Sequence, residues 1–129
     1  MEERPVPEET DLLARRVIGC AITVHRALGP GFLETIYRRA MCIELEAQGL
    51  PFECEKQIVV RYRGLQIRGQ RIDLVAGGQV VVELKAVASI DAAHVAQVLS
   101  YLKTTGLRLG LLVNFHERLL KDGIRRVVL

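Results

Sequence analysis

The sequence contains few cysteines and no long apolar run, and both shortages exclude classes of protein. Its three cysteines, Cys20, Cys42 and Cys54, are odd in number and lack CxxC or zinc-ribbon spacing, so we interpret them as buried thiols. No apolar run approaches the roughly 20 residues of a membrane-spanning helix. The N-terminus is acidic and contains two prolines, unlike a secretory signal, so we expect a cytoplasmic protein without a membrane segment.

Aromatic residues are also scarce, at 5% of the chain, and no recognition-helix pattern is evident. The sequence therefore gives little support for a protein that stacks on bases or reads their edges. Basic pairs such as Arg38-Arg39 predict contacts with phosphates at most. The formal net charge is +3, but residues 1–11 alone carry −4, which leaves +7 on the rest of the chain. A basic body of this kind favours a polyanionic partner.

Length and composition predict one domain. The chain has 129 residues, 50% of them apolar, which suffices for one continuous core and leaves little room for a second. Residues 1–9 are polar, contain Pro5 and Pro7 and show no apolar period, which predicts a frayed tail. We therefore expect a single domain over residues 10–129.

Apolar periodicity predicts the order α-α-β-β-β-α-β, with a further strand at the sheet edge and three of the strands in an antiparallel meander. Thr10 or Asp11 is the expected N-cap of the first helix, Ser89 that of the third, and the first helix ends at Gly29-Pro30-Gly31. The predicted elements are helices over residues 10–28, 32–48 and 89–105 and strands over residues 57–62, 66–75, 80–87, 109–114 and 124–129. The second helix is expected to bury Leu33, Ile36, Ala40, Ile43 and Ala47.

Charged residues interrupt two otherwise apolar strands between residues 71 and 85. The alternating apolar residues are Ile72 and Leu74 in one strand and Val80, Val82 and Leu84 in the next. Both sets meet one core layer if the connecting loop has an odd number of residues, such as a three-residue turn with Gly77 or Gly78 in a left-handed conformation. Asp73 then shares the opposite face with Glu83 and Lys85, with Cβ atoms roughly 4.5 to 8 Å apart.

This grouping of two carboxylates and an ammonium suits phosphodiester hydrolysis. Asp73 and Glu83 repel each other as anions, and a hard divalent cation, Mg²⁺ or Mn²⁺, relieves the repulsion while keeping positions open for water and phosphate oxygens. Such an ion also lowers the pKa of bound water. Lys85 either stabilises charge on the phosphate and orients the attacking water, or acts as general base if its pKa is depressed.

Two helical features extend this candidate site. Gln97 and Tyr101 are four residues apart and stack on one face of the third helix, with His94 one turn earlier, so the set can orient a phosphate or nucleotide. Taken singly, Tyr101 is more often a core residue and His94 a half-exposed polar one. Glu34 begins the second helix, where it either complements the helix dipole or serves as a third carboxylate facing the metal.

Several of these motifs resemble the GxxExxY family of small prokaryotic proteins. The motif itself corresponds to Gly31-Phe-Leu-Glu34-Thr-Ile-Tyr37. The rest of the family pattern is similar to Ile-Asp73, Glu83-Leu-Lys85, Gln97-Val-Leu-Ser-Tyr101 and Gly110-Leu-Leu-Val-Asn114-Phe115, so the resemblance covers residues 12–128. One departure is Ile72, which stands where many relatives have a proline.

The resemblance implies the PD-(D/E)xK superfamily, with a restriction-endonuclease-like core in which a mixed sheet is flanked by helices, that is, an α/β fold of the α+β type. It implies Glu34, Asp73 and Glu83 as metal ligands, Lys85 as the catalytic lysine, and Gln97 with Tyr101 as a helical catalytic motif. Tyr37 serves either packing or chemistry.

The resulting hypothesis is a Mg²⁺- or Mn²⁺-dependent nuclease that acts on DNA or RNA, and superfamily members often dimerise. The alternative is a binding module for nucleic acid or a partner that keeps the fold without cutting. A third reading is a structural subunit of a larger complex. The sequence leaves open which residues bind nucleic acid, the polarity of cutting and the number of metal ions.

Overall fold

The computed structural model describes residues 5–129 and builds them around one five-stranded sheet. The helices are α1 (Glu8–Leu28), α2 (Glu34–Ala47) and α3 (Ala92–Thr105), with a short 3₁₀ helix η1 (Leu120–Gly123). The strands are β1 (Phe52–Tyr62), β2 (Leu65–Ala76), β3 (Val80–Lys85), β4 (Leu109–Asn114) and β5 (Ile124–Val128). This order confirms the expected α/β architecture, including the last strand at the edge of the sheet.

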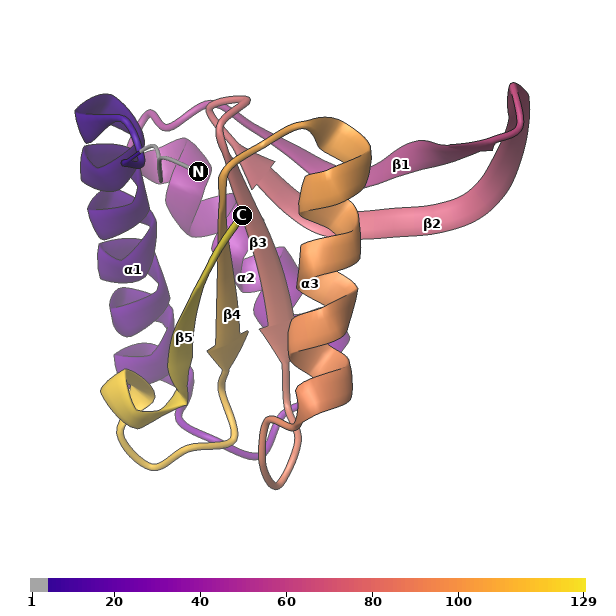
Figure 1. The fold of residues 1–129 in the computed structure, drawn as a ribbon. Helices are drawn as coiled ribbons and strands as arrows, with labels where there is room; N and C mark the ends of the chain where they lie inside the picture. The colour runs from indigo at the N-terminus through magenta and orange to yellow at the C-terminus, as the bar shows by residue number, and fades with distance from the viewer. Residues whose placement is uncertain (1–4) are drawn as a thin grey trace.

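The sheet is mixed, and its strands follow sequence order from β1 to β5. β1, β2 and β3 form the predicted antiparallel meander. β3 and β4 are parallel, and α3 makes the crossover that a parallel pair requires. β5 then pairs antiparallel with β4. In Figure 1, α1 and α2 cover one face of the sheet and α3 covers the other, while the far part of the β1–β2 hairpin projects from the body.

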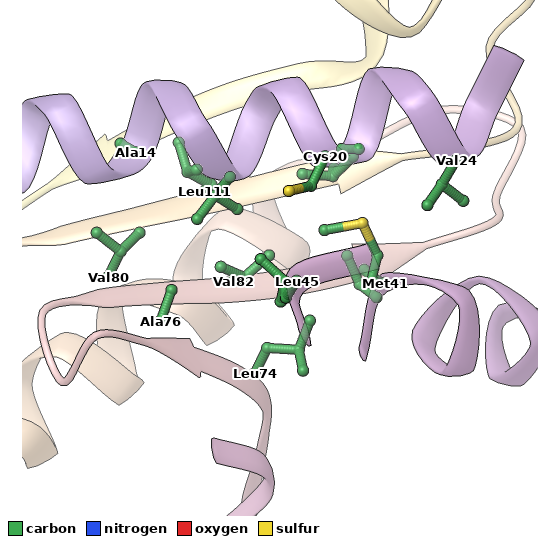
Figure 2. Packing of buried hydrophobic residues seen from close by; sticks show 14 of the residues in the cluster. Ala14, Cys20, Val24, Met41, Leu45, Leu74, Ala76, Val80, Val82 and Leu111 are labelled. Atoms are coloured by element: carbon green, nitrogen blue, oxygen red, sulfur yellow. The ribbon is translucent and has the colours of Figure 1, made fainter. Parts of the chain in front are cut away.

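Two hydrophobic clusters fill the space between these layers. The larger one joins α1 and α2 to the sheet, and Figure 2 shows Cys20 and Val24 of α1 on one side of it, with Met41 and Leu45 of α2 and Val82 of β3 on the other. The smaller one packs α3 on the opposite face through Val98 and other residues. Because both faces are covered, β3 and β4 are buried along their whole length except for Lys85, which is half-buried.

The buried face of α2 differs from the predicted one. The helix buries Tyr37, Met41, Cys42 and Leu45, whereas Leu33, Ile36 and Ile43 are exposed. Both sets of residues recur at helical spacing and differ by a rotation of about one residue, so periodicity alone fits either. Tertiary contacts decide, because the Tyr37 ring stacks on Phe115 with 4.4 Å between ring centroids.

The helix starts also differ from prediction. α1 begins at Glu8 with Pro7 as N-cap, so neither Thr10 nor Asp11 caps it, and the Thr10 hydroxyl instead donates to Gln79 Oε1 at 2.7 Å. The predicted tail over residues 1–9 overlaps this helix at its end, and residues 1–4 lie outside the described range. α3 is capped by Asp91 rather than Ser89.

The cysteines follow the prediction in part. Cys20 and Cys42 are buried, but Cys54 is exposed on β1, and its Sγ lies 3.2 Å from Cys42 Sγ. Cys54 pairs with the buried Leu74, but it lies on the edge strand β1, which leaves it exposed. Within residues 5–129, no helix combines the length and the apolar character needed to cross a membrane.

Candidate functional site

The side chains predicted for the site line one polar pocket between α2, the β1–β2 hairpin, β3 and α3. The predicted residues among its lining are Glu34, Asp73, Glu83, Lys85, Gln97 and Tyr101. They come from four separate elements, so their convergence is a property of the tertiary fold. Their roles in metal binding and catalysis stay predictions.

The β2–β3 turn has the predicted geometry. Ala76 pairs with Val80, which leaves a three-residue loop, and both Gly77 and Gly78 have positive φ values of 54° and 67°. Left-handed backbone is costly for other residues, so the two glycines permit this turn. Continued by one residue, this register places Asp73 across from Glu83 on the same face, and a shared face is what the sequence predicted.

Asp73 is hydrogen-bonded directly to β3. Its Oδ2 accepts the backbone N–H of Leu84 at 2.9 Å, and its own N–H donates to Glu83 Oε1 at 3.4 Å. The aspartate carboxylate thus replaces a backbone acceptor between the two strands. This pair of contacts fixes both carboxylates at the point where β2 leaves β3.

The expected single core layer on this strand pair holds for four of its five residues and fails for Ile72. Leu74 belongs to the cluster under α1 and α2, but Ile72 packs in the cluster under α3. Val75 and Val81 also belong to the α3 cluster, so the face that carries Glu83 is itself partly apolar. Helices on both faces account for the burial of Val75 and Val81. Ile72 lies beyond Leu74, where the pairing of β2 with β3 ends and β2 follows β1 away from the sheet.

Burial and neighbouring negative charge raise the pKa values of two carboxyl groups in the pocket. The Glu83 side chain is only 5% exposed, and burial followed by repulsion from Asp73 raises its pKa to about 8, against a smaller opposing effect of Lys85. The pKa of Glu34 is also raised, first by burial and then by Asp73. Both glutamates therefore experience an excess of negative charge in the pocket.

This pKa shift predicts a pH-dependent stability. Between its unfolded value near 4.5 and about 8, Glu83 holds a proton in the folded state that the unfolded chain releases. The metal-free protein is therefore expected to lose stability as the pH rises from 5 through 8. Thermal melts in EDTA across this range measure the effect. Glu83→Gln removes the titrating group and is expected to flatten the profile, whereas exposed Glu46→Gln should not; equal slopes in all three proteins contradict the assignment.

Lys85 lies between the carboxylates and α3. Its Nζ donates to Gln97 Oε1 at 3.2 Å and is 3.7 Å from Glu83 Oε2. Burial, followed by Glu83, raises the pKa of Tyr101 to about 12, so its hydroxyl keeps its proton at neutral pH. The pocket therefore contains an ammonium and a phenol that can both donate to a phosphate.

Gly110 allows α3 to approach the sheet closely enough for these contacts. A Cβ added to Gly110 would lie 2.5 Å from Val98 Cγ1 on α3. Behind Lys85, the buried Asn114 side chain bonds both the N–H and the carbonyl of Val87, at 3.1 and 2.9 Å. Asn114 thus fixes the loop that follows Lys85.

His94 has a capping role. Asp91 Oδ1 accepts the backbone N–H of His94 at 3.2 Å, and His94 Nδ1 accepts that of Asp91 at 3.1 Å, which together form a capping box. This capping role agrees better with a half-exposed polar residue than with a residue that contacts the substrate.

Tyr37 is a structural residue that positions Glu34. Its hydroxyl donates to the Gly29 carbonyl at 2.5 Å and accepts the Phe32 N–H at 3.2 Å. These bonds tie the corner that includes Gly31, whose φ is 109°, to the first turn of α2. Because Glu34 begins that turn, the tyrosine determines where this carboxylate lies.

Sequence reasoning missed Arg38. Its guanidinium is 3.5 Å from Asp73 Oδ1 and 3.3 Å from Glu55 Oε1, and its side chain is 18% exposed. Arg38 lies one turn after Glu34 on the same face of α2, which was the available signal. Treating Arg38 only as half of a basic pair that contacts phosphates at most did not reveal its place in the pocket.

The pocket contains the carboxylate ligands that a divalent metal ion prefers, but they are not yet arranged to hold an ion. Within residues 5–129, no three His, Cys, Asp or Glu side chains are grouped closely enough to hold an ion as they stand. Asp73 instead contacts Arg38 and the Leu84 amide. Carboxylate oxygens nevertheless suit Mg²⁺ or Mn²⁺. Burial and then repulsion from Asp73 raise the pKa of Glu83, and such an ion would relieve the repulsion. Binding by Glu34, Asp73 and Glu83 requires side-chain movement.

Comparison with known proteins places these residues in context. A family model described as the PD-(D/E)XK nuclease superfamily matches residues 11–127, a range that contains the whole pocket. This match does not single out the GxxExxY family within the superfamily. Neither a curated protein nor a solved structure matches the chain.

Proposed function

The chain belongs to the PD-(D/E)XK nuclease superfamily, and we propose that it is a metal-dependent nuclease that hydrolyses phosphodiester bonds in nucleic acid. One observation supports the activity most directly. Asp73 and Glu83 lie side by side across β2 and β3, and Lys85 reaches from Glu83 to Gln97 on α3. A decayed site is expected to lack some of these groups, whereas here all of them line one pocket.

Each residue of the pocket has a distinct role in the proposed reaction. A Mg²⁺ or Mn²⁺ ion held by Glu34, Asp73 and Glu83 would supply positive charge and a bound water of lowered pKa. Lys85 offers its ammonium to a phosphate oxygen or to the attacking water, and Gln97 orients that ammonium through the 3.2 Å contact.

Tyr101 and Arg38 complete the pocket. The Tyr101 hydroxyl keeps its proton at neutral pH, and burial raises its pKa further, so it can donate a hydrogen bond without adding charge. Arg38 neutralises part of the negative charge at Asp73 in the absence of metal, and its guanidinium suits a phosphate once an ion takes over that charge. Both residues thus favour an anionic substrate.

Metal binding and cleavage test the proposal together. Calorimetry is expected to show Mn²⁺ binding at or below millimolar concentration by the wild type and a clear loss by Glu34→Gln, with exposed Glu46→Gln as the matched control. Labelled single-stranded, duplex, branched and RNA oligonucleotides are then incubated with Mn²⁺ or with EDTA. Cleavage only with metal supports a nuclease.

Two outcomes would reject this function. Folded wild type that cuts none of these substrates with metal is not a nuclease of this kind. If Mn²⁺ also fails to bind at millimolar concentration while oligonucleotides still do, the protein is a binding module that retains the fold.

A further inference from the structure

The outer part of the β1–β2 hairpin, residues 59–69, extends from the body as an arm. Figure 1 shows it reaching away from the sheet on the side of α3. Arg63 and Gly64, with φ values of 52° and 79°, form the two-residue turn at its tip, between the paired Tyr62 and Leu65. An exposed hairpin of this length buries little of its own surface, which indicates a function outside folding.

The arm carries only positive charge. Arg61, Arg63 and Arg68 are exposed, and no acidic residue lies between Glu55 and Asp73. The cations at its base are neutralised, since Lys56 pairs with Glu53 and Arg71 with Glu55. Among the described residues, no carboxylate forms an ion pair with any of the three arm arginines. The arm thus presents three uncompensated cations to solvent.

Register gives the arm two different faces. Val60 pairs with Ile67 and Tyr62 with Leu65, so these four residues share one face. Tyr62, Leu65 and Ile67 are 66%, 72% and 51% exposed. Arg61 pairs with Gln66 and lies on the other face, where Arg68 also falls by alternation. One side is therefore apolar and the other basic.

The root of the arm is fixed to the pocket. Ile58 and Ile72 are buried in the cluster under α3, and Gln70 Nε2 donates to Ser100 Oγ on α3 at 3.2 Å. Gln70 and Arg71 also line the pocket itself. The arm consequently has a defined direction relative to Asp73.

We propose that the arm is a second contact for double-stranded nucleic acid, in which its apolar face lies in a groove and its long arginine side chains extend past the arm's edges to the phosphates that border this groove, distant from the pocket. The proposal deepens the proposed function and rests on it. Asp73 lies nine positions after Gly64, a reach of up to roughly 30 Å along a strand. That length equals about nine base pairs of duplex.

The length and chemistry of the arm favour a duplex over a single strand. A duplex is stiff over this distance, so one held at the pocket brings its phosphates to the arm without further ordering. Minor-groove binding proteins combine arginines with exposed apolar residues in the same way. A second copy of the chain is a poorer occupant, because the protein itself carries a net charge of +3.

The salt dependence of duplex binding tests the arginines. The arm variant combines Arg61→Gln, Arg63→Gln and Arg68→Gln, and the control variant combines Arg15→Gln, Arg26→Gln and Lys121→Gln, which are exposed on α1 and η1. Fluorescence anisotropy in EDTA measures Kd for a 30-base-pair duplex between about 50 and 200 mM salt, where counterion release dominates. The arm variant is expected to reduce the salt slope by up to about 2.7, or about 0.9 per lost phosphate contact. The control is expected to keep the wild-type slope.

A small substrate separates the arm from the active site. Bis(p-nitrophenyl) phosphate does not reach the arm, so its metal-dependent hydrolysis is expected to be equal in wild type and arm variant. If the wild type hydrolyses neither this ester nor the oligonucleotides, the proposed nuclease is rejected, while arm-dependent duplex binding still supports the arm. If the arm variant and the wild type have equal salt slopes, the proposal that the arm binds duplex phosphates is rejected, whether or not the protein hydrolyses phosphodiesters.

The apolar face is tested separately. Tyr62→Ser with Leu65→Ser is expected to weaken duplex binding about tenfold without changing the salt slope, because it removes contacts that release no counterions. Sedimentation measures the oligomeric state of wild type and variant, and so tests whether a second copy of the chain binds the arm. A wild-type dimer that dissociates in this variant, with unchanged duplex affinity, would show that the arm binds a second copy instead.

Discussion

Lys85→Met is expected to reduce metal-dependent cleavage by about 10²- to 10³-fold while the protein stays folded. Methionine preserves most of the length of the aliphatic stem but removes the ammonium that contacts Gln97 and lies 3.7 Å from Glu83. Single-turnover cleavage of a labelled oligonucleotide with Mn²⁺ measures the loss. The matched control, Lys103→Met, changes an exposed lysine near the end of α3 and is expected to cut normally.

Asp73→Asn provides the companion test on the opposite strand. Asparagine can still accept the Leu84 N–H that Asp73 binds at 2.9 Å, so the β2–β3 contact survives while the negative charge is lost. Both cleavage and Mn²⁺ affinity are expected to fall, whereas Lys85→Met should weaken cleavage alone. Cleavage that survives both substitutions would show that this pocket is not the active site.

Tyr37→Ala is expected to have the largest effect on stability, about 3 to 5 kcal/mol of unfolding free energy. The ring is fully buried and stacks on Phe115, so alanine leaves a cavity between α2 and the end of β4. Urea denaturation monitored by circular dichroism measures the change.

Tyr37→Phe separates packing from hydrogen bonding. It keeps the ring but leaves the Gly29 carbonyl and the Phe32 N–H without their partner, at a cost of about 1 to 3 kcal/mol. It is also expected to weaken Mn²⁺ binding, because the same bonds hold the turn that carries Glu34. Exposed Tyr62→Phe is the control and should change neither stability nor metal affinity. Unchanged Mn²⁺ affinity in Tyr37→Phe would limit Tyr37 to packing.

Much of the site could be predicted because strand register is a local property. The register of β2 and β3 followed from the alternation of apolar residues and from the two glycines of the turn, Gly77 and Gly78. It placed Asp73 beside Glu83, with Lys85 two residues further on the same face. Helical spacing likewise placed Gln97 and Tyr101 together. These relations depend only on backbone geometry, which the sequence determines over short distances.

Other features depended on contacts between segments far apart in the sequence. Periodicity could not choose between two faces of α2, and stacking of Tyr37 on Phe115 chose the one that leaves Leu33 exposed. The same rotation turned Arg38 toward Asp73. No local pattern distinguishes these cases, because each depends on which surface another element offers.

By itself, then, the sequence determined the order of elements, the β2–β3 register and the identity of the charged residues on it. Only the tertiary structure decided which face of the sheet each helix covers, that Arg38 and Lys85 enter the same pocket, and that residues 59–69 project as an arm. The physical reason is the range of the interactions: hydrogen-bonded register acts between neighbouring strands, whereas burial is settled among all elements at once.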